Sequence, residues 1–140
     1  MGPSYTQPHT RAWAEKMASF DGDIFVTPEY NHSITGALKN AIDYLYVEWH
    51  NKAVGFVSYG LTGGTRAVEH LRLIMSELQI PHVRAQVALS LSADFTNRTD
   101  PTPGTQHERT LHTMLDQLIA WSDALKTLRP AEQASAAIAA

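Results

Sequence analysis

Two short polar stretches of this sequence carry groups that could hold a ligand. Residues 27–33 read Thr-Pro-Glu-Tyr-Asn-His-Ser and offer a carboxylate, an aromatic ring, an amide and a hydroxyl. Residues 60–65 read Gly-Leu-Thr-Gly-Gly-Thr, and glycines let a backbone approach a ligand closely. Each stretch follows an apolar run and precedes a helical pattern. Both are therefore expected at the carboxyl end of a strand, where open α/β sheets bind ligands.

Each stretch also has an interpretation that needs no ligand. Pro28 fixes its own φ and pushes Thr27 toward extended geometry, so residues 27–33 could be a strand-to-helix connection with polar caps. Residues 60–65 could be a tight turn before a helix, because they lack the lysine of a P-loop and the spacing of a dinucleotide fingerprint. In a parallel sheet with adjacent strands the two stretches lie side by side. One flat aromatic ligand could then touch both.

Other chemistries find little support. The chain has no cysteine, which excludes disulfides, thiolate catalysis and cysteine-ligated metals. Its seven histidines show no metal-binding spacing and are expected at the surface. Ser33 and Ser58 lack the Gly-x-Ser-x-Gly elbow of a hydrolase nucleophile. Asn31 begins a glycosylation sequon, which we attribute to chance because no secretion signal accompanies it.

Composition indicates a globular chain. The 140 residues are 44% hydrophobic and 18% charged, with a formal net charge of −3, which argues against nucleic acid or an anionic membrane as a partner. No apolar run is long enough to span a membrane, so we expect a cytoplasmic protein. One domain is expected over residues 1–130. The Ala-rich segment 131–140 is expected to be a flexible tail.

Hydrophobic periodicity predicts alternating helices and strands. Strands are expected at 24–26, 52–59 and 83–91, and helices from Thr10, from Gly36, after residue 65 and over 106–128. This order predicts a three-stranded parallel sheet with right-handed crossovers.

Finer features of these elements follow from their patterns. The first strand is apolar without alternation, as in a strand covered on both faces, whereas Arg84 and Gln86 mark the third strand as an exposed edge. The helix from Gly36 is expected to carry its apolar stripe to Trp49, and the last helix to bury Trp121 and Leu128. Phe20 is expected on the stripe of the first helix. Arg66 is expected in solvent, and residues 92–105 are expected to form a long mobile loop.

The two polar stretches and their flanks resemble a known family. Residues 27–33, with Gly-Ala-Leu-Lys-Asn-Ala-Ile-Asp-Tyr-Leu at 36–45, closely resemble the signature of the NADPH-dependent FMN reductases. Residues 58–67, Ser-Tyr-Gly-Leu-Thr-Gly-Gly-Thr-Arg-Ala, resemble the second flavin loop of the same family. The similarity covers nearly all of the chain. It implies a flavodoxin-like, three-layer α/β/α fold, bound FMN, NADPH or NADH as co-substrate, and a homodimer or homotetramer.

The resemblance also implies which residues bind the cofactor. Two groups would hold FMN, the first along the isoalloxazine ring, chiefly through backbone groups, and the second at its polar edge: Thr27, Pro28, Glu29, Tyr30 and Asn31; Ser58, Tyr59, Gly60, Gly63 and Gly64. No protein side chain is expected to be catalytic and no metal is expected, because the flavin itself carries the electrons from NAD(P)H to a small-molecule acceptor such as a quinone, azo dye or metal oxyanion.

The chain departs from the family pattern at its N-terminus. Family members begin with a strand, a Gly-Ser-x-Arg loop around the FMN phosphate, a helix and a second strand, and residues 1–22 show none of these. The sheet is therefore expected to be reduced to about three strands, with an open edge at its first strand and with weakened FMN binding. Two hypotheses follow: an FMN-dependent NAD(P)H oxidoreductase, or a non-catalytic homologue that acts as an interaction or assembly subunit.

Overall fold

The computed structural model describes residues 5–129, and three parallel strands form its centre. The strands, in the spatial order β1-β2-β3, are β1 (Gly22–Pro28), β2 (Ala53–Gly60) and β3 (His82–Ser90). Strands β1 and β2 pair without interruption from Gly22 opposite Ala53 to Pro28 opposite Tyr59. The predicted parallel sheet of three strands is confirmed.

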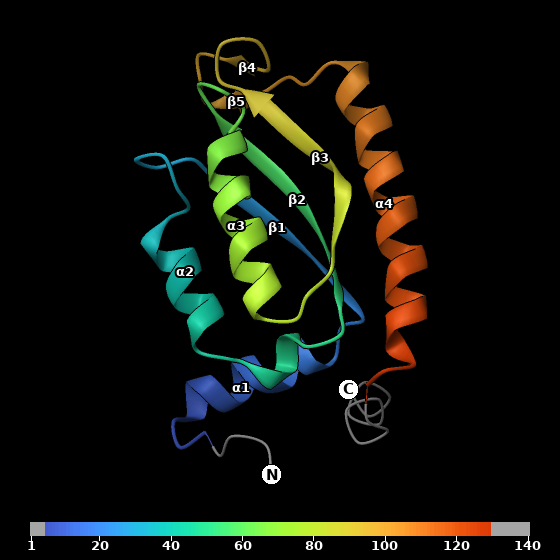
Figure 1. Cartoon of the computed structure of the whole chain (residues 1–140). Helices are drawn as coiled ribbons and strands as arrows, with labels where there is room; N and C mark the ends of the chain where they lie inside the picture. The colour runs from blue at the N-terminus through green and yellow to red at the C-terminus, as the bar shows by residue number, and fades with distance from the viewer. Residues whose placement is uncertain (1–4, 130–140) are drawn as a thin grey trace.

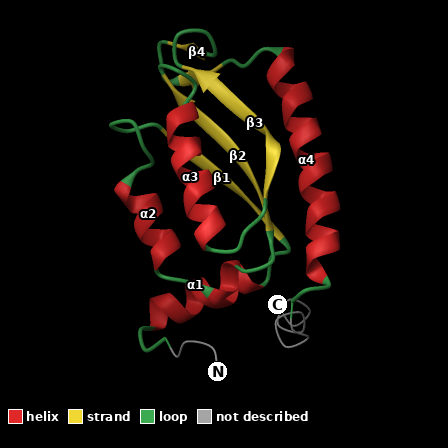
Figure 2. Cartoon of the chain, in the orientation of Figure 1, coloured by secondary structure: helices red, strands yellow, loops and turns green. Residues whose placement is uncertain are grey.

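Helices cover both faces of this sheet (Figure 1, Figure 2). Helices α2 (Gly36–Asp43) and α3 (Thr65–Glu77) lie on one face, and α4 (Thr105–Lys126) lies on the other. Helix α1 (Pro8–Ala18) crosses the end of the sheet where the strands begin. This is the three-layer α/β/α arrangement that the sequence predicts. Within residues 5–129, no helix has the length and apolar character needed to cross a membrane.

Alternate residues of β2 supply the two hydrophobic cores, because successive side chains of a strand point to opposite faces. Val54 and Phe56 pack in the core beneath α2 and α3, with Trp49 and Leu71. Ala53 packs in the core beneath α4, around Met114. On the same face of β2, Gly55 leaves space for Met114, since a Cβ at Gly55 would lie only 2.9 Å from the Met114 sulfur.

Charged groups fasten the ends of the elements to one another. Asp21, just before β1, accepts from Lys126 Nζ at 2.7 Å and pairs with Arg129. These two hydrogen bonds lower the pKa of Asp21. Lys52 is buried, and its Nζ donates to the carbonyl of Met17 at the end of α1. Burial lowers the pKa of Lys52. The hydrogen bond to Met17 joins helix α1 to the start of strand β2.

The helices around the first core differ from the predicted ones. Helix α1 begins at Pro8, where proline suits the first turn, and Phe20 lies beyond its end and is exposed. Helix α2 ends at Asp43, short of the predicted stripe. Trp49 sits instead in the 3-10 turn η1 (Val47–Trp49), buried, and donates from Nε1 to the carbonyl of Ile42 at 3.0 Å. Its apolar spacing therefore reflects a second short element rather than a longer helix.

Strand β1 and helix α4 are less covered than predicted. Only one face of β1 is buried, since Phe25 and Thr27 point into the core while Ile24 and Val26 are 38% and 62% exposed. On α4 the buried residues are Met114, Leu118 and Ser122, whereas Trp121 is exposed, as is Leu128 just beyond the end of the helix. The helix covers mainly β3 and β2 and hardly reaches over β1.

Residues 92–105 contain more structure than the predicted loop. Strands β4 (Phe95–Thr96) and β5 (Asp100–Pro101) form a small antiparallel hairpin. Asp94 anchors it, because its carboxylate accepts from the Ser90 amide and pairs with His107, both at 2.8 Å. The predicted flexible tail, 131–140, lies outside the described residues.

Removal of the Trp49 side chain tests the packing of the first core. Trp49 is 1% exposed and contacts the rings of Trp13 and Phe25. Trp49→Ala should lower the free energy of unfolding by about 3–5 kcal/mol, because it leaves a large cavity in the core. Chemical denaturation measures this change. The matched variant Trp121→Ala, at a position that is 46% exposed, should cost less than about 1 kcal/mol. Equal losses would contradict the assignment of Trp49 to the core.

Candidate cofactor-binding site

The pairing of β1 with β2 brings the two polar stretches together. Thr27 lies opposite Ser58 and Pro28 opposite Tyr59, and the Glu29 amide donates to the carbonyl of Tyr59 at 2.9 Å. All ten predicted cofactor-binding residues therefore lie at or just beyond the carboxyl ends of these two strands. Their proximity is as expected, and their role in binding remains a prediction.

A tight reversal presents the aromatic ring of the first stretch to solvent. The amides of Tyr30 and Ser33 each donate to the other residue's carbonyl at 2.9 Å. Between them Asn31 and His32 have positive φ values of 46° and 72°, a conformation that asparagine tolerates better than most residues. The Tyr30 ring is consequently 64% exposed and free to meet a ligand.

The glycines of the second stretch are required by the packing of the chain itself. Gly63 and Gly64 both have positive φ, near 70°. A Cβ at Gly64 would lie 2.8 Å from both the Cβ of Ser58 and the amide nitrogen of Tyr59. No larger residue fits without moving β2. Gly64 is also the N-cap of α3, so this close approach places the start of the helix against the sheet.

Thr27 and Ser58 form the floor of the site. Both are buried. The Ser58 hydroxyl donates to the Gly63 carbonyl at 2.7 Å and accepts from Gln86 Nε2 at 3.2 Å. The Thr27 hydroxyl donates to the Pro28 carbonyl at 2.9 Å. These side chains support the turns from below, and the residues that can meet a ligand lie above them.

An ion pair clamps the first stretch to helix α3. Glu29 accepts from Arg66 Nε at 2.6 Å and from the Arg66 backbone amide at 3.3 Å. Arg66 is thus an ion-pair partner rather than the solvent-facing residue predicted. The hydrogen bond from Arg66 lowers the pKa of Glu29. One of the amides at the start of α3 is therefore occupied by a carboxylate of the chain.

A second contact lies one turn further along α3. His70 Nδ1 is 2.8 Å from the Ser33 hydroxyl, and the His70 and His32 rings are 6.1 Å apart. Sequence reasoning did not select Arg66 or His70 for the site. Their separation of four residues places both on one face of a helix. That spacing was the available signal, but it does not say which loop the face meets.

Donor groups left over at this edge fit the chemistry of a flavin. Within residues 5–129, no hydrogen bond uses the backbone N–H of Asn31, Thr62 or Gly64. An isoalloxazine ring carries carbonyl and ring-nitrogen acceptors along one edge and is flat enough to lie against Tyr30. The donors and the exposed ring therefore suit it. In the same part of the chain no three His, Asp or Glu side chains are grouped as metal ligands.

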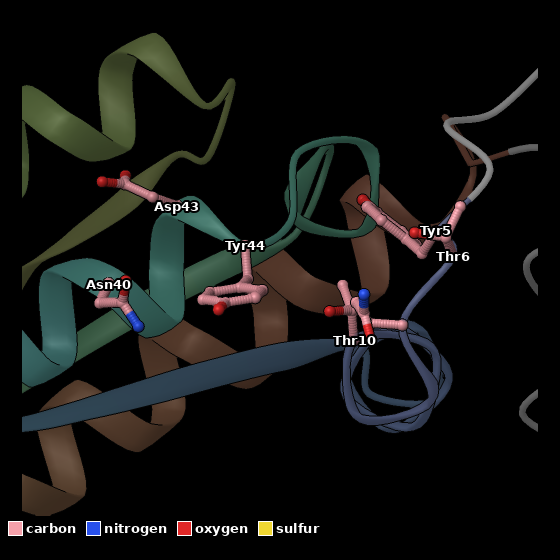
Figure 3. A pocket seen from close by; sticks show the side chains of 7 residues that line it. Tyr5, Thr6, Thr10, Asn40, Asp43 and Tyr44 are labelled. Atoms are coloured by element: carbon pink, nitrogen blue, oxygen red, sulfur yellow. The ribbon is translucent and has the colours of Figure 1, made fainter.

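The pocket in Figure 3 is a separate feature. It has a volume of about 420 Å³ and lies between the N-terminal segment and the end of α2, lined by Tyr5, Thr10, Asn40 and Tyr44 among others. Burial and the hydrogen bond to Glu48 raise the pKa of Tyr5 to about 12. None of the ten predicted residues lines this pocket. It is not the candidate site.

Comparison with known proteins assigns the family. The model of the NADPH-dependent FMN reductase family matches residues 1–94, more than half of the chain. The chain belongs to this family. The matched region contains both polar stretches.

Proteins similar to this chain are named as FMN or quinone reductases. An NAD(P)H-dependent FMN reductase of Schizosaccharomyces pombe is 43% identical over 90 residues, which cover 64% of this chain and 45% of the relative. A 2-hydroxy-1,4-benzoquinone reductase of a Burkholderia species is 32% identical over 136 residues, covering 85% of this chain and 73% of the relative. The chain thus spans about half the length of the first of these relatives.

A solved structure supports the fold of this FMN reductase family member. The flavoenzyme FerB, an NAD(P)H:acceptor oxidoreductase of Paracoccus denitrificans, superposes with a TM-score of 0.62 at 19% identity, covering 87% of this chain and 70% of FerB. At that identity the likeness concerns the fold alone. It confirms the flavodoxin-like arrangement that the sequence predicts.

A matched pair of glycine substitutions tests the close approach of the turn to β2. Gly64→Ala should destabilise the protein by more than about 2 kcal/mol, because it combines a steric clash with a left-handed backbone. Gly36→Ala should be neutral or stabilise by up to about 1 kcal/mol, since a Cβ there meets nothing within 4 Å and alanine favours a helix. Thermal unfolding of both variants measures this. A tolerated Gly64→Ala would refute the packing described.

The Glu29–Arg66 clamp predicts a pH dependence. Because the folded pKa of Glu29 lies below its ordinary value of 4.5, the ion pair stabilises fully above pH 4.5 and is lost as the pH falls through the lowered pKa. The protection factor of the Arg66 amide, which compares its exchange rate with the intrinsic rate at the same pH, should fall across that acid range in the unmodified protein.

Glu29→Gln should exchange faster already at neutral pH and cost about 1 kcal/mol. The control is Asp43→Asn, which removes the exposed Lys39–Asp43 pair and should leave the Arg66 amide unaffected. A protection factor at Arg66 that is independent of both pH and Glu29 would show that the clamp is absent in solution.

Proposed function

We propose that this chain forms the flavin-ring part of an FMN-dependent NAD(P)H oxidoreductase. The observation that carries the proposal is the register of β1 with β2, which sets an exposed aromatic ring beside turns with unused amide donors. When bound, FMN would accept a hydride from NADPH or NADH and pass two electrons to a second substrate. The names of the relatives, FMN reductase and quinone reductase, support a small-molecule acceptor such as a quinone.

The roles of the site residues follow from their positions. The Tyr30 ring would lie against the isoalloxazine, and the amides of Asn31 and Gly64 would donate to its acceptor edge. Thr27 and Ser58 hold these turns from beneath. Glu29 keeps the first turn against α3. Residues 5–129 contain no Gly-Ser-x-Arg stretch, so their contribution would be contacts to the ring rather than to the phosphate.

Assembly and location are part of the same proposal. We expect this chain, like the family that it resembles, to form homodimers or homotetramers in the cytoplasm. The exposed Ile24 and Val26 on β1 support burial of that strand against further polypeptide, because exposed apolar side chains beside an open sheet edge favour association.

The same exposed strand favours a second candidate function. A chain that binds flavin weakly could serve as an interaction or assembly subunit, with β1 paired to a partner. The two functions differ in whether FMN binds. A protein that remains colourless and gives no signal when titrated with FMN would refute the oxidoreductase proposal and favour the subunit.

Titration of FMN into two tyrosine variants tests the ring site. The unmodified protein should quench flavin fluorescence saturably and oxidise NAD(P)H in the presence of a quinone. Tyr30→Ala should weaken FMN binding by about three- to tenfold through the lost aromatic contact, with an unchanged melting temperature. The control is Tyr46→Ala, at an exposed tyrosine away from the site. Identical FMN affinities in the two variants would exclude Tyr30 from the ring contact.

A further inference from the structure

A second cavity lies on the outer edge of the sheet, between α3 and α4. Its volume is about 600 Å³ and its lining combines two arginines, carboxamides and an indole, including Arg72, Arg84, Gln117 and Trp121. Its β3 residues begin at His82, the first residue of that strand. The flavin-ring residues lie instead at the far ends of β1 and β2. The cavity therefore opens away from the proposed FMN site, although Gln86 in its lining donates to the buried Ser58 hydroxyl beneath that site.

Arg72 is held rigidly at the wall of this cavity. Its guanidinium donates to the Val83 carbonyl at 3.1 Å, lies 2.6 Å from His82 Nδ1 and packs over the Phe56 ring at 5.0 Å. The side chain is only 17% exposed. A cation withdrawn from water in this way is stabilised by a nearby negative group.

The carboxylate nearest to Arg72 is a weak partner. Glu69 Oε1 lies 3.7 Å from Arg72 Nε, and the Glu69 side chain is 74% exposed. No other carboxylate in the described part of the chain forms an ion pair with Arg72. Its remaining hydrogen bonds go to the carbonyls of Val83 and Arg84 and to Gln86 Oε1, so Arg72 places a positive charge at the cavity wall with no close carboxylate beside it.

Further polar and aromatic groups complete the lining. Arg84 is exposed, and its side chain has no hydrogen-bond or ion-pair partner among residues 5–129. Gln117 accepts from the Ala85 amide at 3.3 Å through Oε1, which leaves its amino group available as a donor. Trp121, 46% exposed, offers an aromatic face one helical turn further along α4.

Protection of an edge strand explains part of this arrangement. Arg72 and Gln117 occupy two carbonyls and an amide of β3, and such caps discourage pairing with another chain. That purpose does not require Arg84 or an exposed tryptophan beside them. An exposed indole beside an unpaired guanidinium can instead contact a planar ring and an oxyanion together.

We propose that this cavity binds an organic anion that carries a carboxylate or phosphate group on a planar ring. The oxyanion would accept from the Arg84 guanidinium, whose flat donor array matches such a group, and the fixed positive charge of Arg72 would attract it from the cavity wall. The ring would stack on Trp121. The Gln117 amino group would donate to the remaining oxygen. The site takes a second ligand, independent of the flavin and its electron acceptor.

Three small probes separate the parts of this recognition. Benzoate carries both the ring and the charge, inorganic phosphate carries the charge alone, and benzamide carries the ring alone. Benzoate should bind saturably to the 140-residue chain and move the NMR signals of the Trp121 indole and the Gln117 side-chain amide. Phosphate should move the Gln117 signal more weakly. Benzamide should have little effect.

Two variants that change the charge of the cavity in opposite directions test the proposal further. Arg84→Gln should weaken benzoate binding about tenfold or more through loss of a charge-assisted contact. Glu69→Gln should tighten it severalfold, because it removes the carboxylate that competes for Arg72. Arg11→Gln on α1 and Glu77→Gln on α3 make the same changes in net charge at exposed positions outside the cavity. These controls should retain the original affinity.

Several results would overturn the proposal. They are the absence of saturable benzoate binding, equal affinity for benzamide, or equal effects of the Arg84 and Arg11 variants. A Trp121 signal that shifts with protein concentration alone would also overturn it, by showing that the face is covered by another copy of the chain. All four readouts are independent of flavin binding and of turnover.

Discussion

The close approach of Gly64 to strand β2 governs the geometry of the candidate site. Because Gly64 has no Cβ, which would meet Ser58 and Tyr59 at 2.8 Å, the turn can lie against the sheet, and helix α3 begins where the turn ends. The start of α3 in turn positions Arg66 and His70, which hold residues 29–33 from the side. One missing side chain thus determines where two loops and a helix meet.

The polar groups at this edge divide into those used by the chain and those left over. Glu29 occupies the Arg66 amide, and the Ser58 hydroxyl occupies the Gly63 carbonyl. The remaining amides, at Asn31, Thr62 and Gly64, are neutral donors. A flat neutral ring with acceptor atoms suits this arrangement better than a phosphate, which would compete with Glu29 for the start of α3. The division explains how glycine-rich turns can serve a ring rather than an anion.

The sequence predicts the sheet, its order and the adjacency of the two stretches, because period-two and period-3.6 patterns and crossover rules depend on local residue types. It does not predict contacts that depend on how elements end. Trp49 continues the apolar spacing of α2 although the helix stops at Asp43. The apolar run predicts that Ile24 and Val26 are buried, but both are exposed, because their burial depends on which elements lie over β1. Arg66 reads as a solvent residue because its partner, Glu29, is distant in sequence and reaches it only through the strand register.

Every pairing in the main sheet is parallel, and this has a consequence for how the chain folds. No two of its strands can meet through a hairpin; each pairing must wait until an intervening helix has been traversed. Loop closure then precedes any ladder hydrogen bond, which slows folding relative to local topologies. Strand β2 lies between β1 and β3, so its two pairings form in separate steps. If β2 pairs with β3 before it pairs with β1, the apolar side chains of β1 remain exposed to neighbouring chains for longer during synthesis.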